Sequence, residues 1–154
     1  MPDKEELKSI TFKIEKYFQS EAELIKVLKH CDQFFVTIDE TQKKFRIRKD
    51  LSVSEIKNDI LKILGCYGVL NPILSIAEAE EGNRRVRQYA TLLNNHDASE
   101  GKFVDGKTEK LSLDYVSTYR KVRKIIKGYV EVAKTTLSVG QSILKSAIEN
   151  RDVT

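Results

Sequence analysis

The sequence predicts a mainly α-helical protein, in which N-terminal helices and a small β-hairpin pack on a long antiparallel helical hairpin. Three observations predict this fold class. Apolar or small residues recur at spacings of four and three through residues 111–150, short β-type runs interrupt this period between residues 34 and 47, and two stretches open with helix-capping patterns. Spacings of three and four are typical of amphipathic helices, whereas short runs of aromatic and β-branched residues indicate strands.

The first part of the chain, residues 1–68, is expected to form an α-β-β-α module. A first helix covers residues 3–18. The pattern Ser20–Glu23 is a capping box, in which the serine and the glutamate satisfy each other's free backbone donors. It opens a second helix that ends near Cys31, and a further capping box at Ser52–Glu55 opens the last helix of the module.

Between these helices the sequence predicts a β-hairpin. Residues 34–38 and 45–47 are the two strands, and residues 39–43 form the loop that joins them. An isolated two-stranded hairpin is only marginally stable, so it must lie on helices. The glycines of residues 65–68 are expected to break the helix that follows.

The second part, residues 69–154, predicts the long helical hairpin, and we expect it to form one compact unit with the first. Its first helix begins near Pro72, which suits a first turn because no N–H is needed there, and it runs to about Asn94. A loop at residues 94–110 contains Asp105-Gly106, a dipeptide preferred in tight hairpin turns, which predicts a small flap. The stretch from residue 111 onward then folds back, and at ~1.5 Å per residue it is roughly 58 Å long.

The totals exclude few classes of protein. The net charge is +4, with 27 basic and 23 acidic residues, which permits a nucleic-acid partner without demanding one. Two cysteines do not make a disulfide framework, and the first residues lack the apolar run of a signal peptide. The longest uncharged stretch, residues 63–77, is shorter than the ~20 residues that span a bilayer, so we read it as a buried bend. A cytoplasmic protein without a membrane segment is therefore expected.

Two groups of cations are the most suggestive feature of the sequence. The groups are residues 84–87 and 120–127. Residues 84–87 and 120–124 lie at similar distances before and after the loop, so an antiparallel pairing of their helices would place them side by side, ~10 to 18 Å from the turn. One band of eight cations could bind phosphates, and Tyr89 and Tyr119 beside it could stack on unpaired bases. The candidate nucleic-acid-binding residues are Arg84, Arg85, Arg87, Arg120, Lys121, Arg123, Lys124 and Lys127.

The band has an alternative interpretation as a solvated, ion-paired helix face. Glu78, Glu80 and Glu81 lie about one turn away, and exposed ion pairs contribute only ~0 to 1 kcal/mol each. A second basic run, residues 43–49, would form one face of the hairpin, but edge strands carry such residues to block unwanted pairing.

Signs of catalysis are few. The histidines and cysteines are His30, Cys31, Cys66 and His96, and their spacing lacks the paired elements of a zinc site. No nucleophile elbow, Walker motif or dinucleotide-binding glycine pattern is present. We therefore expect no enzyme, no cofactor and no metal; a small enzyme using residues 94–110 as a lid is the weakest alternative.

The last third of the long helix, Thr135–Ile148, carries apolar groups on most sides, and its polar residues are short. It is either covered by the N-terminal module or forms a subunit interface, for which a twofold dimer is the commonest form. The stretch that begins with Tyr129-Val-Glu-Val-Ala133 and continues to Ile148 is faintly similar to the small recombination mediators of T4-type phages. This resemblance implies nucleic acid as a partner.

The sequence thus predicts a non-enzymatic, helical, self-associating binding protein. The first hypothesis is an accessory protein that holds DNA or RNA through the basic band. The alternative is an oligomeric assembly or adaptor protein that docks a partner protein through the apolar C-terminal helix.

Overall fold

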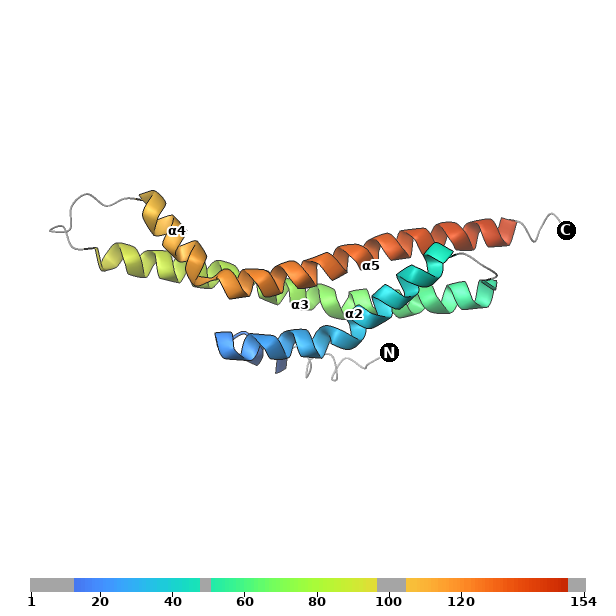
Figure 1. Cartoon of the computed structure of the whole chain (residues 1–154), viewed down its shortest axis with the longest axis horizontal. Coiled ribbons are helices and arrows are strands. Elements are labelled where there is room, and N and C mark those ends of the chain that lie inside the picture. Colours follow the sequence, from blue (N-terminus) through green and yellow to red (C-terminus); the bar gives the residue numbers. More distant parts are fainter. Residues whose placement is uncertain (1–12, 48–50, 97–104, 150–154) are drawn as a thin grey trace.

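The computed structural model describes residues 13–47, 51–96 and 105–149, and 94% of these residues are helical. Figure 1 shows α5 running antiparallel along α3, with α2 crossing this pair and α4 inclined to both at one end. A helical turn at residues 13–17 and the 3-10 turn η1 come first along the chain. The elements are η1 (Glu21–Glu23), α2 (Leu24–Ile47), α3 (Val53–Asn94), α4 (Asp105–Tyr115) and α5 (Ser117–Glu149).

The pairing of α3 with α5 is the most extensive contact of the fold, and the predicted antiparallel arrangement of these helices is confirmed. The predicted long final helix is divided, however, because α4 ends at Tyr115 and α5 begins at Ser117. In α5 the period of three and four buries one residue per turn. The buried residues of α5 are Tyr119, Val122, Ile126, Val130, Ala133, Thr136 and Gly140.

The predicted β-hairpin is wrong, since the described residues contain no strand and residues 34–47 belong to α2. Aromatic and β-branched side chains at positions 34–38 suggest a strand, but the residues that α2 buries recur at spacings of three and four. The proposed loop at residues 39–43 contains no glycine, proline or asparagine, and Thr41 within it is buried. Helical packing therefore overrides the local β preference, and the helix expected to end near Cys31 runs to Ile47. The buried residues of α2 are Leu24, Val27, Cys31, Phe35, Ile38, Thr41 and Phe45.

The predicted break at residues 65–68 is also absent. Helix α3 continues through both glycines and carries Pro72 inside it, and the division expected at residue 68 falls within this helix. Pro72 is exposed, so the backbone carbonyl that loses its partner faces solvent. The flap expected at Asp105-Gly106 is instead the first turn of α4, and residues 97–104 of the predicted loop lie outside the described residues.

The two predicted capping boxes differ in outcome. The Ser52 hydroxyl accepts a hydrogen bond from the Glu55 backbone N–H at 3.2 Å, and the Glu55 carboxylate accepts one from the Ser52 backbone N–H at 2.9 Å. Ser20 caps only the short turn η1 and makes no such side-chain hydrogen bond. Of the predicted first helix, residues 13–17 are helical, Phe18 lies in a turn, and residues 3–12 lie outside the described residues.

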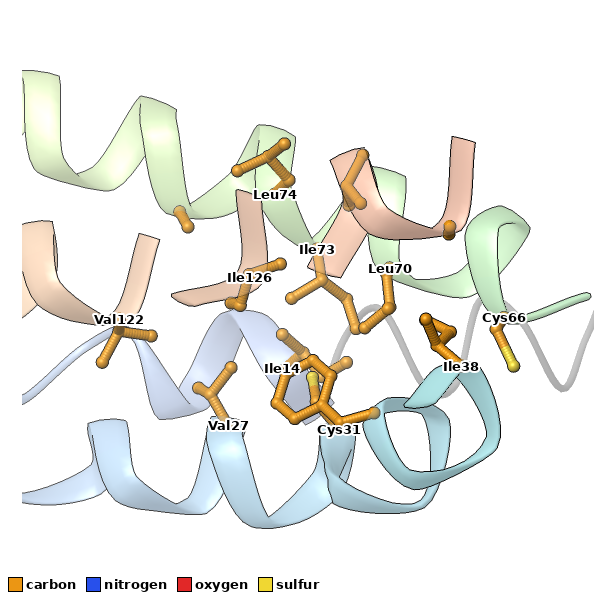
Figure 2. Packing of buried hydrophobic residues seen from close by; sticks show 14 of the residues in the cluster. Ile14, Val27, Cys31, Ile38, Cys66, Leu70, Ile73, Leu74, Val122 and Ile126 are labelled. Carbon is orange, nitrogen blue, oxygen red and sulfur yellow. The ribbon is translucent and has the colours of Figure 1, made fainter. Parts of the chain in front are cut away.

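The core forms where α2, α3 and α5 meet, and Figure 2 shows side chains from all three converging around Ile14. In this view Ile73 and Leu70 of α3 and Ile126 of α5 lie above Ile14, and Cys31 of α2 lies below it. The N-terminal turn and the first half of α5 therefore share one core. The labelled members are Ile14, Val27, Cys31, Ile38, Cys66, Leu70, Ile73, Leu74, Val122 and Ile126.

By length and composition, α3 is the one described helix that could cross a membrane. Its most apolar 18-residue window has a mean hydropathy of 1.7, and 33% of that window is buried. Core helices of soluble proteins meet the same criterion, so this is weak support for a span. The expected cytoplasmic location stays a prediction.

Two glycines of α5 test the helix packing. A Cβ at Gly140 would lie 2.6 Å from Cε2 of Phe45 and 2.9 Å from Cγ1 of Ile60, whereas a Cβ at Gly128 would meet nothing within 4 Å. Gly140→Ala should therefore destabilise the fold by about 1 to 3 kcal/mol through overpacking. Gly128→Ala should stabilise it by about 0.5 to 1 kcal/mol through helix propensity. Urea unfolding followed by circular dichroism measures both, and equal stabilisation by the two changes would contradict the close approach of α2, α3 and α5.

The capping box of α3 provides a second test. Ser52→Ala removes the acceptor for the Glu55 N–H, and the loss of such a cap destabilises proteins by about 0.5 to 2 kcal/mol. In a domain of this size the melting temperature should fall by roughly 2 to 8 °C. Ser54→Ala, at an exposed position two residues away, is the control and should leave it nearly unchanged.

The same cap predicts a pH dependence. Hydrogen bonds from the Ser52 backbone and hydroxyl lower the pKa of Glu55. The stabilisation is therefore present above the pKa of Glu55 in the unfolded chain, and it is lost as the pH falls through the lower value in the folded state. The difference in melting temperature between the wild type and Glu55→Ala should shrink as the pH is lowered from 7 toward 3. A difference that stays constant would refute the hydrogen-bonded carboxylate.

Candidate functional site

Arg84, the first residue of the predicted band, points into the bundle. Its Nη2 donates hydrogen bonds to the backbone carbonyls of Phe18 and Gln19, both at 2.8 Å, and its guanidinium lies 4.5 Å from the ring centroid of Tyr119. Its Nε is 3.5 Å from the Glu80 carboxylate. Arg84 thus ties the N-terminal segment to the α3–α5 pair and is not a surface cation.

Tyr119 is correspondingly unsuited to base stacking. Its ring is buried beneath Arg84, and burial raises the pKa of its hydroxyl. Tyr89, the other tyrosine considered for stacking, donates a hydrogen bond from its hydroxyl to Asp105 of α4, which raises its pKa. Both tyrosines therefore make their contacts within the protein.

Arg120 and Arg123 meet at a single carboxylate, that of Glu81 on α3. Nε of Arg120 is 3.2 Å from Oε1 of Glu81, and Nε of Arg123 donates to Oε2. The Glu81 side chain is only 14% exposed, and Arg120 also donates to the carbonyl of Leu113 at 3.3 Å. One negative charge holds two positive charges, so this cluster retains a net positive charge.

Arg85 and Arg87 leave α3 in different directions. Arg85 pairs across the helices with Glu109 of α4, at 2.7 Å. Two residues along an α-helix correspond to a rotation of about 200°, so Arg87 lies on nearly the opposite side of α3 from Arg85. Arg87 is exposed, and the structure does not bring it to the cations of α5.

The three lysines of the band remain on the surface. Lys121, Lys124 and Lys127 are exposed, and within the described part of the chain none of them forms an ion pair. No acidic residue occurs in α5 between Ser117 and Val130. The lysines therefore form an open basic face of α5, with the Arg120–Arg123 cluster beside it.

The eight predicted site residues thus separate into groups. Five of them stay together around one stretch of α5, while the three arginines of α3 are used or placed elsewhere. The ion pairs with Glu80 and Glu81 that the alternative interpretation expects are present. Glu78, the third acid considered, is exposed and forms no ion pair among the described residues.

The second basic run is helical and not a strand face, because residues 43–47 end α2. Nζ of Lys44 lies 2.6 Å from Oδ2 of the buried Asp59, and Nζ of Lys62 forms a second ion pair with Oδ1 of Asp59 at 3.3 Å. The hydrogen bond to Asp59 raises the pKa of Lys44. This cluster joins α2 to α3, and its role is to stabilise the fold.

The cysteines are buried as neutral thiols. Burial raises the pKa of Cys31 to about 12 and also raises the pKa of Cys66. No group of three or more His, Cys, Asp or Glu side chains in the described residues is arranged to hold a metal ion. A thiol that is not ionised is neither a good nucleophile nor a metal ligand.

An open hollow between α2 and α5 was not foreseen, because it depends on α2 being helical. Its volume is about 530 Å³, and the rings of Phe35 and Tyr129 stack at 4.0 Å along it. The Tyr129 hydroxyl donates to Oδ2 of Asp39 at 3.1 Å. Lys29 and Asp32 at its rim carry opposite charges, so the hollow has no net preference for an ion.

Comparison with known proteins gives no assignment: no protein family matches this chain, and no characterised protein or solved structure is significantly similar to it.

The shared carboxylate of Glu81 yields a further test. Glu81→Gln leaves the two guanidiniums side by side without a counter-charge, and the loss of hydrogen bonds between charged groups should destabilise the fold by about 1 to 3 kcal/mol. Glu78→Gln removes the same charge from an exposed position of the same helix and should change stability by less than about 0.5 kcal/mol. Urea unfolding measures both changes. Equal effects of the two substitutions would show that Glu81 does not hold the arginines.

Proposed function

We propose that this protein is a non-enzymatic accessory protein that binds the phosphate backbone of nucleic acid through the basic face of α5. The supporting observation is the balance of charge there. Three exposed lysines and two arginines occupy residues 120–127, and Glu81 is the one carboxylate paired with them among the described residues. The resulting local charge of +4 lies along about 11 Å of helix.

The chemistry of such a face favours phosphates over anions that have a lower charge density. Lysines that lack an ion-pair partner release condensed counterions when they contact a polyanion, which drives binding without reading the base sequence. The two arginines are held by Glu81, so they contribute to the positive electrostatic potential more than to direct contacts with phosphate. A surface of three to five phosphate contacts binds weakly and depends steeply on salt.

The proposal predicts the salt dependence. With about 0.9 counterions released per contact, affinity for duplex DNA should fall by roughly 40- to 500-fold between 50 and 200 mM salt. Lys121→Glu combined with Lys124→Glu should weaken binding by at least about 100-fold at 50 mM salt, because two attractions become repulsions. Fluorescence anisotropy of labelled DNA and RNA oligonucleotides measures both effects.

The control distinguishes binding by the α5 face from a general effect of net charge on binding. Lys13→Glu combined with Lys57→Glu makes the same change in charge at exposed positions on other elements and should weaken binding only a few-fold. Binding that is equally sensitive to both pairs, or that is absent at 50 mM salt, would refute the α5 face as the site. The lysines are better targets than Arg123, whose replacement would also break its bond to Glu81.

The alternative is an intracellular assembly or adaptor protein that docks a partner protein through the C-terminal part of α5. One observation favours it, since Ile148 is 42% exposed near the end of that helix. The surface is narrower than expected, because Gly140 packs on Phe45 and Ile60 and Leu144 is half-buried. Leu144→Asp abolishes partner binding in this alternative and leaves nucleic-acid binding intact.

A further inference from the structure

The outward face of α3 has no charged residue from Leu61 to Leu93, in a chain of which 32% is charged. Large apolar side chains stand near both ends of this face, where Leu61 is 64% exposed, Val86 68% and Leu93 47%. Small residues occupy its middle, and the outward positions repeat at spacings of four and three. Such a face is typical of a helix that packs on another helix.

Helices α2 and α5 contact the opposite side of α3, where its buried residues lie, and leave this face open. Helix α4 borders one edge of the face near its C-terminal end, where Asp105 and Glu109 line a hollow together with Gly82 and Val86. Val86 nevertheless stays 68% exposed. Charged side chains, among them Lys62, Glu78 and Arg87, flank the face. An uncharged centre with a charged rim is the composition of a protein–protein interface.

We propose that this face binds the same face of a second copy of the chain, in an antiparallel dimer whose twofold axis passes between Ser75 and Ala79. In this register residue i of one copy lies level with residue 154 − i of the other. Ser75 then meets Ala79, and Leu61 meets Leu93. A twofold interface of this kind uses one patch twice.

The pattern of side-chain sizes is the reason for choosing a second copy of the chain as the partner. In the same register Val86, the most exposed of these side chains, lies level with Gly68, and Leu64 lies level with Ala90. Pro72 likewise meets Gly82. Each of these three bulky residues faces a small one, while Leu61 and Leu93 pair with each other at the two ends. The face is therefore complementary to itself when it is reversed, and the small residues allow the two backbones to approach closely.

The extent of the face agrees with a dimer of moderate affinity. A strip of 33 residues is about 48 Å long, and at a helix width of ~10 Å it buries roughly 1,000 Å² over both partners. This is the lower limit for a specific interface. The dissociation constant is accordingly expected to be in the range of ~1 to 100 μM. The proposal uses none of the cations of α5 and stands independently of nucleic-acid binding.

Analytical ultracentrifugation of the full chain from about 2 to 300 μM tests the dimer. The wild type should pass from the mass of one chain to that of two, and Ala79→Glu should raise the dissociation constant by about 100-fold, because two added carboxylates meet beside the axis. Gln141→Glu places the same charge on an exposed position of α5 and should leave the dimer unchanged. A wild type that stays monomeric, or an Ala79→Glu variant that dimerises as before, overturns the proposal.

Two further arms distinguish the other occupants of the face. Disruption of the dimer by Leu144→Asp but not by Ala79→Glu would assign self-association to the C-terminal helix instead. Flotation of a monomeric wild type with phosphatidylcholine vesicles, abolished by Ala79→Glu, would assign the face to lipid. Either result rejects the second copy as the occupant.

Cross-linking tests the direction of the helices. Oxidation of an equimolar mixture of Gly68→Cys and Val86→Cys chains should give disulfide-linked dimers, whereas each variant alone should give few. The native Cys31 and Cys66 are buried and do not compete. Efficient cross-linking of Gly68→Cys chains to themselves would indicate a parallel pair and would refute the antiparallel register.

Discussion

The antiparallel contact between α3 and α5 is the constraint on which the rest of the fold depends. Both helices gain most of their stability from packing and not from helix propensity, and each buries one side against the other. Helix α2 lies across this pair and completes the core, while α4 is held at one end by the bonds of Asp105 and Glu109 to α3. The N-terminal turn joins the same core through Ile14 and Phe18.

The structure divides the cations of the chain according to their chemistry. In the predicted band, Arg84, Arg120 and Arg123 take fixed, partly buried positions, because a planar guanidinium can satisfy several acceptors at once, as Arg84 and Arg120 do. Lysines remain on the outside of α5, where a flexible ammonium keeps its water. A run of basic letters in the sequence therefore contains two populations, and the fold separates them.

Much of the helical framework could be predicted from the sequence, because the periods of α3 and α5 are long and the Ser52 capping box is local. The incorrect prediction of a β-hairpin could not be avoided by considering short stretches of sequence alone. The aromatic and β-branched residues of 34–38 favour a strand by themselves, and their helical spacing becomes evident only when Val27, Thr41 and Phe45 are included. Similarly, Gly65 and Pro72 are breakers in isolation, but in α3 they lie on the exposed side and tertiary contacts on the other side keep the helix continuous.

The candidate site was predictable only in part, for a related reason. Sequence position places Arg84 and Arg120 at the same height along a helical pair, and height is all that spacing can provide. Whether a side chain turns inward depends on where its acceptors lie, and those of Arg84 are the carbonyls of residues more than sixty positions earlier. The direction of Arg87 follows from the same rotation about the helix axis.

The acceptors of Arg84 are main-chain oxygens, and this has a consequence for how the protein can change. A carbonyl is supplied by any amino acid, so the exposed Gln19 is free to be exchanged without loss of the link. The arginine has no such freedom, because no other side chain spans both oxygens while covering the Tyr119 ring. Substitutions at this joint should thus accumulate at Gln19, while Arg84 and the buried Phe18 stay constant.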